Sequence, residues 1–134
     1  MGSFKDLLVY KKSFELAMEI FQNSKSFPKE ETYSLTDQIR RSSRSTNICI
    51  TEAYRKRKYP NHFISKLTDA DMENNETQGW LEFCKACSYI TEEEFILLNL
   101  KAEEIGKLIN YMIMNPEKFG SDTKSKSGTI SAAN

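Results

Sequence analysis

The sequence predicts an all-α protein that folds as an up-down antiparallel four-helix bundle. Apolar residues recur every three or four positions along four long segments. The 134 residues include only 5 glycines and 3 prolines, fewer turn residues than an all-β chain of this length needs. The connections between the segments are short, which places successive helices antiparallel to each other.

The first helix is predicted from Phe4 to Asn23. Its apolar residues repeat at seven-residue intervals with others beside them, and we expect this stripe to face the core. The stripe consists of Leu7, Leu8, Phe14, Ala17, Met18 and Phe21. A break follows at Phe27, because the proline after it disfavours a helical backbone there. The second helix is predicted from Ser34 to Arg57, with small residues in the middle of its stripe that allow close approach of a neighbour.

The third helix is predicted from Asn61 to Ser88, and its inward stripe contains two polar residues, Asn74 and Thr77. Buried polar side chains are costly unless they form hydrogen bonds. We therefore expect a small polar network at this level of the bundle, reaching Glu52 or an arginine of the second helix.

The fourth helix has the clearest start. Thr91 is a capping residue, and Glu94 three positions later completes a capping box. An apolar stripe then continues to Met114, where Asn-Pro ends the helix. Since the remaining residues are mostly small and polar, we expect a bundle domain over residues 1–118 and a flexible, disordered tail over residues 119–134.

The overall composition indicates a soluble cytoplasmic protein. Its formal net charge is +0 and its hydrophobic fraction 39%, which is ordinary for a globular chain. The amino-terminal residues lack the apolar core of a signal peptide. No run approaches the roughly 18 apolar residues of a membrane span, so we expect no membrane association.

Charge is unevenly distributed along the chain. Residues 34–66 contain eight basic and two acidic residues, whereas residues 67–104 contain ten acidic and two basic residues. The molecule is therefore electrostatically polar. Either pole can meet a partner, or the two poles can meet each other in an oligomer.

Metal binding and catalysis find little support in the residue pattern. Cys84 and Cys87 have the CxxC spacing, but no second cysteine pair or histidine pair completes four ligands, and His62 is the single histidine. We interpret the cysteines as small apolar residues and expect no metal, no cofactor and no enzymatic activity.

One catalytic alternative remains open. Arg57 precedes His62 with four residues between them, a spacing that resembles the arginine and histidine of the HEPN ribonucleases. The resemblance implies a histidine that activates a ribose hydroxyl and an arginine that steadies the phosphate. Pro60 lies within the stretch, which that family keeps helical. The other interpretation is a solvated connection between helices.

Basic residues form the stronger candidate site. Tyr54 and Tyr59 lie among them and can stack on bases. We predict a surface that binds RNA or DNA, while a solvated or oligomer-facing charge cluster is the alternative. The candidate nucleic-acid-binding residues are Arg40, Arg41, Arg44, Arg55, Lys56, Arg57 and Lys58.

Two blocks carry a family resemblance. Residues 27–42 read FPKEETYSLTDQIRRS, and residues 49–57 read CITEAYRKR. The order Phe-Pro, Glu, aromatic, Leu and Gln-Ile-Arg-Arg, followed by a second block and basic residues, resembles the 23S rRNA intervening-sequence proteins. These include the Avd accessory proteins of diversity-generating retroelements. Cys49 stands where the family has asparagine, which removes a polar side chain expected to face inwards.

The resemblance extends from Phe4 to Met114 and implies a four-helix bundle that assembles as a ring-like homopentamer. Because Avd works with a reverse transcriptase and structured RNA through basic surface, it also implies a non-enzymatic accessory role with those partners. The alternative is a homo-oligomeric protein-interaction scaffold with no nucleic-acid role.

Overall fold

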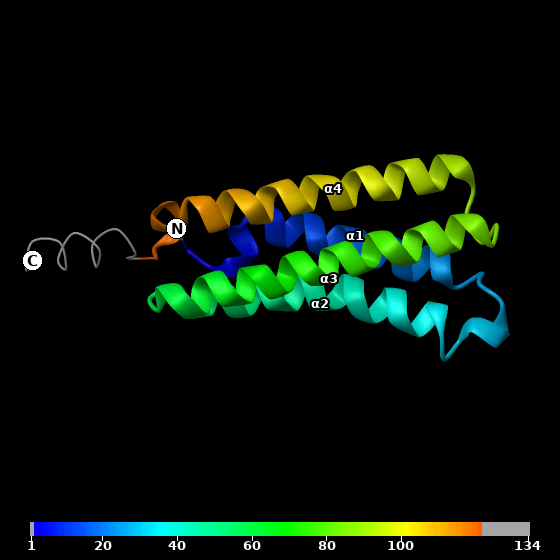
Figure 1. Ribbon diagram of the computed structural model, residues 1–134, viewed down its shortest axis with the longest axis horizontal. Helices are drawn as coiled ribbons and strands as arrows, with labels where there is room; N and C mark the ends of the chain where they lie inside the picture. The colour runs from blue at the N-terminus through cyan, green and yellow to red at the C-terminus, as the bar shows by residue number, and fades with distance from the viewer. Residues whose placement is uncertain (1, 122–134) are drawn as a thin grey trace, which may run out of the picture.

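The computed structural model describes residues 2–121, which form four long helices with successive helices antiparallel (Figure 1). The all-α four-helix bundle predicted from the sequence is confirmed. The long helices are α1 (Leu8–Ser24), α2 (Leu35–Arg55), α3 (Pro60–Ala86) and α4 (Glu92–Met114). Three short 3₁₀ helices accompany them: η1 (Phe4–Asp6), η2 (Lys29–Glu31) and η3 (Pro116–Phe119).

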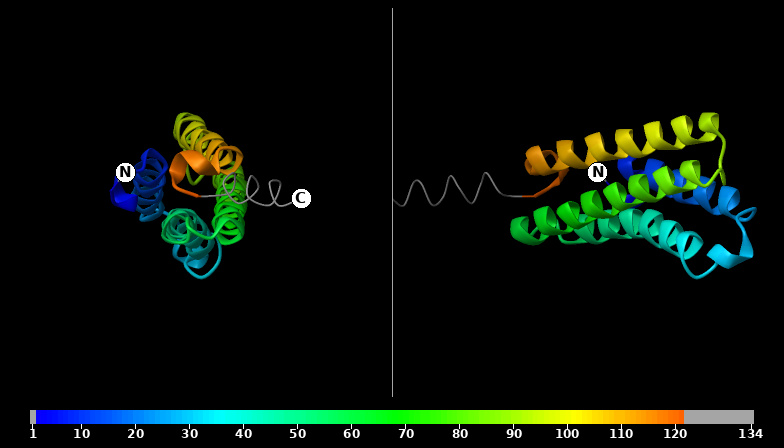
Figure 2. Two further views of the ribbon diagram at one scale, coloured as in Figure 1. Left: turned by 90° about the vertical axis from the view of Figure 1, so that its left-hand side faces the viewer. Right: turned by 45° about the vertical axis from the view of Figure 1, so that its right-hand side comes forward.

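The connections lie at the two ends of the bundle. The α1–α2 and α3–α4 connections share one end, and the α2–α3 connection lies at the other end together with the last turn of α4 (Figure 1). Viewed end-on, the four helices surround a common centre (Figure 2). That centre is a single apolar core, in which Phe63, Leu67, Ile105 and Ile109 are almost completely buried.

Local signals explain where the helices begin. The Thr91 hydroxyl accepts a hydrogen bond from the Glu94 amide at 3.0 Å, and the Glu94 carboxylate accepts one from the Thr91 amide at 2.8 Å. This is the predicted capping box. Pro60 occupies the first turn of α3, where its missing amide hydrogen costs nothing.

The predicted core stripe of the first helix is correct at Leu7 and Ala17, which are buried, and differs from the structure at its other positions. Val9, Leu16 and Ile20 are buried, whereas Phe14 is 51% exposed and Met18 42% exposed. The helix has apolar residues on two sides, so periodicity alone could not choose between them. Packing selects the side with small neighbours, because Ser13 lets α2 come close enough for its Asn47 to donate a hydrogen bond to the Ser13 hydroxyl at 3.1 Å.

The expected polar network is present, but its partners differ from the prediction. Thr77 and Ser42 of α2 share a hydrogen bond of 2.8 Å between their hydroxyls. Asn74 donates instead to the main-chain carbonyl of Ala102 in α4, also at 2.8 Å. Glu52 lies at the surface, where it faces Lys66 at 3.8 Å. The network therefore links three helices through uncharged groups.

The chain beyond α4 turns back onto the bundle. Phe119 packs edge-on against Tyr111, and the side chain of Ser121 is buried. Gly120 adopts a left-handed backbone with φ of 88°, which ends η3. The first three residues of the expected tail, 119–121, thus pack against the bundle, and residues 122–134 lie outside the described part of the chain.

Candidate nucleic-acid interface

The seven predicted basic residues fall into two groups along α2. Arg40, Arg41 and Arg44 lie in its first half, and the segment from Arg55 to Lys58 lies at its carboxyl end. At 1.5 Å rise per residue, about 16 Å of helix separates Arg44 from Arg55. The structure therefore divides the predicted site into two, which we call the α2 groove and the basic end.

The α2 groove is a depression of about 620 Å³ that runs along α2 from Thr32, just before the helix, to Glu52. Tyr33 stands at this groove with 93% of its surface exposed. Besides Tyr33, the lining residues are Thr32, Thr36, Asp37, Arg40, Arg41, Arg44, Ser45, Ile48, Cys49 and Glu52.

Arg40 and Arg44 turn toward α1. The Arg40 Nε donates a hydrogen bond to the Ser24 hydroxyl at 2.7 Å. Both guanidinium groups lie over the ring of Phe21, at 4.8 Å for Arg40 and 5.4 Å for Arg44. Phe21, expected in the core, is thus a platform for cations. Neither arginine forms an ion pair within residues 2–121.

Arg41 turns the other way, toward α3. Its Nη1 lies 3.2 Å from the Glu73 carboxylate and its Nη2 lies 2.8 Å from that of Glu76. Partial burial raises the pKa of Glu73 above its ordinary value, against the opposing effect of Arg41. These two glutamates, which lie outside the basic segment of the sequence, offset the charge of Arg41 and reduce its use as a phosphate contact.

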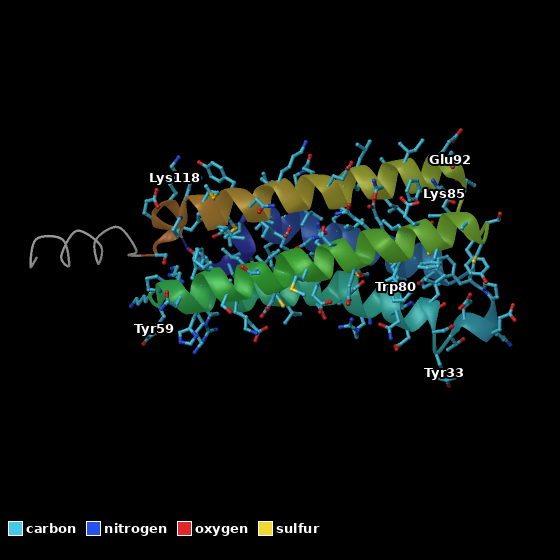
Figure 3. All side chains as sticks on the ribbon, viewed as in Figure 1. Tyr33, Tyr59, Trp80, Lys85, Glu92 and Lys118 are labelled. Carbon is cyan, nitrogen blue, oxygen red and sulfur yellow. The ribbon has the colours of Figure 1, made fainter. Side chains whose placement is uncertain are left out.

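The basic end presents a different arrangement. Arg55, Lys56 and Lys58 are exposed and form no ion pair within the described chain. Tyr59, also largely exposed, packs edge-on against His62 with 6.2 Å between ring centroids. Figure 3 shows Tyr59 at the end of the bundle opposite to Tyr33.

Arg57 is held by the protein itself. Its guanidinium lies 4.1 Å from the centre of the Tyr54 ring, and its Nη1 donates to the Tyr54 carbonyl at 2.9 Å. A Cβ placed on Gly120 would lie 3.2 Å from the Arg57 side chain. Arg57 therefore joins the end of α2 to the segment after η3.

The structure does not bring together the two residues of the HEPN-like ribonuclease alternative, Arg57 and His62. Arg57 points to Tyr54 while His62 packs on Tyr59, and no hydrogen bond or ring contact joins the two residues. Residues 2–121 contain no cluster of three side chains able to hold a metal ion.

The cysteines lie in unlike surroundings. Cys84 is buried and Cys87 exposed, and burial raises the pKa of Cys84 to about 12, so it is a thiol at neutral pH. Cys49, expected to face inwards, is only partly buried and lines the α2 groove.

Exposed apolar residues mark a further surface. Phe14, Met18 and Leu97 line a groove of about 610 Å³ between α1 and α4. On the other side of α1, Phe14 and Met18 line a second groove of about 300 Å³ with Ile48 of α2. The apolar stripe predicted for the first helix included Phe14 and Met18, but as core residues. None of the helices within residues 2–121 has the length and apolar character needed to cross a membrane.

Four antiparallel helices with two separate groups of basic residues along the second helix define a small helical-bundle protein with cationic side chains at its surface. The family described as 23S rRNA-intervening sequence protein matches residues 5–111, and the chain belongs to this family. The resemblance found in the sequence is thereby confirmed.

A solved structure agrees with this assignment. The chain is similar to a protein of unknown function from the S23 ribosomal protein family of Bacteroides thetaiotaomicron. The two are 36% identical with a TM-score of 0.74, and the match covers 82% of this chain and 98% of that one. Among curated proteins, none matches this chain.

Proposed function

We propose that this protein is a non-enzymatic accessory protein that binds RNA through its basic end. The observation that carries the proposal is the exposure of Arg55, Lys56 and Lys58 without an ion pair in residues 2–121. Cations in this state contact phosphates at little cost, and each contact releases condensed counterions. The description of the family, which refers to an intervening sequence of 23S rRNA, supports RNA as the nucleic acid.

The test is RNA binding measured by fluorescence anisotropy at several salt concentrations. The wild-type protein should bind a structured RNA with an affinity that falls steeply as salt rises. The double variant Arg55→Glu/Lys58→Glu should bind at least about 10-fold more weakly, and the slope of log affinity against log salt should shrink by about two. Arg57 is left unchanged because it holds Tyr54.

The matched control is Lys11→Glu/Lys107→Glu, which makes the same change in net charge. Both lysines are exposed and form no ion pair within the described residues, and they lie on α1 and α4 and not in the basic segment at the end of α2. The control should retain most of the wild-type affinity. Equal losses in both double variants would indicate a general charge effect and would contradict the proposed interface.

An RNA cleavage assay tests the proposal that the protein has no catalytic activity. Structured RNA incubated with the wild-type protein should remain intact, and the His62→Ala variant should behave identically. Cleavage that disappears in His62→Ala would replace this proposal with the HEPN-like ribonuclease alternative.

A second candidate function, a homo-oligomeric protein scaffold with no nucleic-acid role, is favoured by the exposed apolar side chains Phe14, Met18 and Leu97. Self-assembly is compatible with both functions, and the family resemblance implies a ring-like homopentamer. The resemblance also implies a reverse transcriptase as the protein partner of an RNA-binding assembly. Light scattering with and without structured RNA separates the functions: an oligomer that gains mass with RNA only at low salt supports RNA binding, and one indifferent to RNA supports the scaffold.

A further inference from the structure

We infer that the α2 groove binds one unpaired nucleotide of an RNA strand, with its base stacked on Tyr33 and its phosphate held by Arg40 and Arg44. The inference rests on the proposed RNA binding and adds the kind of RNA that is recognised. The basic end contacts phosphates of any RNA, whereas the groove selects a base that is free of pairing.

Tyr33 is the first element of this site. It lies between η2 and α2 with 93% of its surface exposed, so its ring is not used in packing. The loop that presents it is nevertheless anchored. The Glu31 carboxylate accepts hydrogen bonds from the Ser34 hydroxyl at 2.6 Å and from the Tyr89 hydroxyl at 2.8 Å. Phe27 also packs against the Tyr89 ring, with 5.5 Å between centroids.

An exposed aromatic ring on an anchored loop is a ready platform for a base. Every base has a flat face, and stacking on such a ring contributes substantially to single-strand binding without demanding a particular sequence. Because both faces of a base within a duplex are already stacked, only bases in loops, bulges and ends can use the platform.

Arg40 and Arg44 are the second element. They lie one helical turn apart, about 6 Å along the axis of α2, and they line the same groove as Tyr33. The Phe21 ring beneath them and the bond from Arg40 Nε to Ser24 restrict their positions. The terminal nitrogens of Arg40 make no bond to the chain within residues 2–121 and match the oxygens of a phosphate.

The charges around the groove limit what it can hold. Asp37 and Glu52 also line it, and Glu73 and Glu76 offset the charge of Arg41. Only Arg40 and Arg44 are cations without an ion pair here, so the surface is too small and too mixed in charge to follow the backbone of a duplex. A volume of about 620 Å³ is of the size that holds a small ligand.

Tyr33 and the basic end are separate regions of one molecule, although the groove itself extends along α2 to Glu52. Figure 3 shows Tyr33 near the α1–α2 connection and Tyr59 at the opposite end of the bundle. A structured RNA with a paired stem and an unpaired loop therefore matches the two regions together. Variants of one region should leave the contribution of the other intact.

The experiment compares two RNAs of equal length, a hairpin with 2-aminopurine in its loop and a fully paired duplex. Wild-type protein should bind the hairpin more tightly and quench the 2-aminopurine fluorescence as the base stacks. Tyr33→Ala should weaken hairpin binding by about 10-fold, abolish the quenching and leave duplex binding unchanged. Tyr33→Phe, which keeps the ring, should behave as the wild type does.

The outcomes distinguish the two proposals. If the wild-type protein binds neither RNA, the proposed function itself fails. If it binds both RNAs and Tyr33→Ala retains the wild-type affinity for the hairpin or its quenching, RNA binding stands and the groove inference is overturned. Since Tyr33 is almost fully exposed, the variant should keep the helical circular dichroism of the wild type, which checks that folding is unaffected.

Discussion

Asn74 of α3 donates a hydrogen bond from its Nδ2 to the main-chain carbonyl of Ala102 in α4 at a distance of 2.8 Å, and both residues are buried in the core. Gly106, one turn further along α4, makes room for it: a Cβ at that position would lie 3.4 Å from the same Nδ2. This bond fixes the relative height of α3 and α4, because apolar packing alone is compatible with sliding.

Replacing Asn74 by alanine should destabilise the protein by about 1–3 kcal/mol, because it removes a buried hydrogen bond and leaves a gap in the core. The measurement is urea unfolding followed by far-ultraviolet circular dichroism. Asn110→Ala is a matched control, since Asn110 also donates to a carbonyl of α4, that of Gly106 at 2.9 Å, but is exposed. The control should change stability by less than about 0.5 kcal/mol. Equal losses of stability in the two variants would show that burial does not determine how much such a hydrogen bond stabilises the protein.

Gly120→Ala and Gly79→Ala should change stability in opposite directions. Gly120 has a φ of 88° and an added Cβ would press on the Arg57 side chain at 3.2 Å, so alanine should cost about 1–2 kcal/mol. Gly79 lies within α3 with open space around it, and alanine there should stabilise by about 0.4–1 kcal/mol. Thermal unfolding of the two variants gives the comparison. A stabilising Gly120→Ala would contradict the packing of residues 119–121 on the bundle.

Local sequence signals predicted the fold more completely than the site. The Thr91–Glu94 capping box formed as expected because its partners are three residues apart. The core side of α1 could not be predicted, since Phe14 is as apolar as Leu16 and only the neighbouring helices distinguish them.

The candidate site depended on contacts between distant residues. Composition identified Arg41 as basic, but its partners Glu73 and Glu76 lie more than thirty residues away. The same limit applies to Arg57, which the sequence grouped with its neighbours and the structure holds over Tyr54. Tyr33 was part of the family block, yet its exposure beside two arginines appears only in three dimensions.

Glu31 should contribute a pH-dependent part of the stability. Hydrogen bonds from Ser34 and Tyr89 hold the pKa of Glu31 below its ordinary value of 4.5. A group whose pKa is lowered by folding stabilises the protein above its unfolded pKa and loses that effect as the pH falls through its folded pKa. The difference in unfolding free energy between wild type and Glu31→Gln should therefore be constant near neutral pH and shrink below pH 4.5.

The control for that experiment is Glu30→Gln. Glu30 is exposed and forms no hydrogen bond or ion pair within residues 2–121, although it adjoins Glu31 in the chain. The difference in unfolding free energy between wild type and Glu30→Gln should not show the pH dependence expected for Glu31→Gln. If both variants show the same pH dependence, the effect arises from the local charge and not from the Glu31–Tyr89 contact.

The exposed face of α1 should control the solution mass of the protein. Phe14 lines both apolar grooves beside α1, and we expect a second copy to cover it in a homo-oligomer. Phe14→Lys should lower the mass measured by light scattering to that of a monomer, because burying a lysine charge in an apolar contact is costly. Met114→Lys provides the control: Met114 is also exposed, but lines neither groove, and its variant should keep the wild-type mass.

The effect of salt on the solution mass distinguishes an apolar interface between copies from a charged one. Assembly through the apolar face should persist at high salt, which screens exposed charges but does not weaken apolar burial. Dissociation of the wild-type protein at high salt would instead favour an interface in which the basic end of one copy meets acidic residues of the next. A wild-type protein that is monomeric at every salt concentration would reject self-assembly by either surface, and Phe14 and Met18 would then be a surface for a different partner.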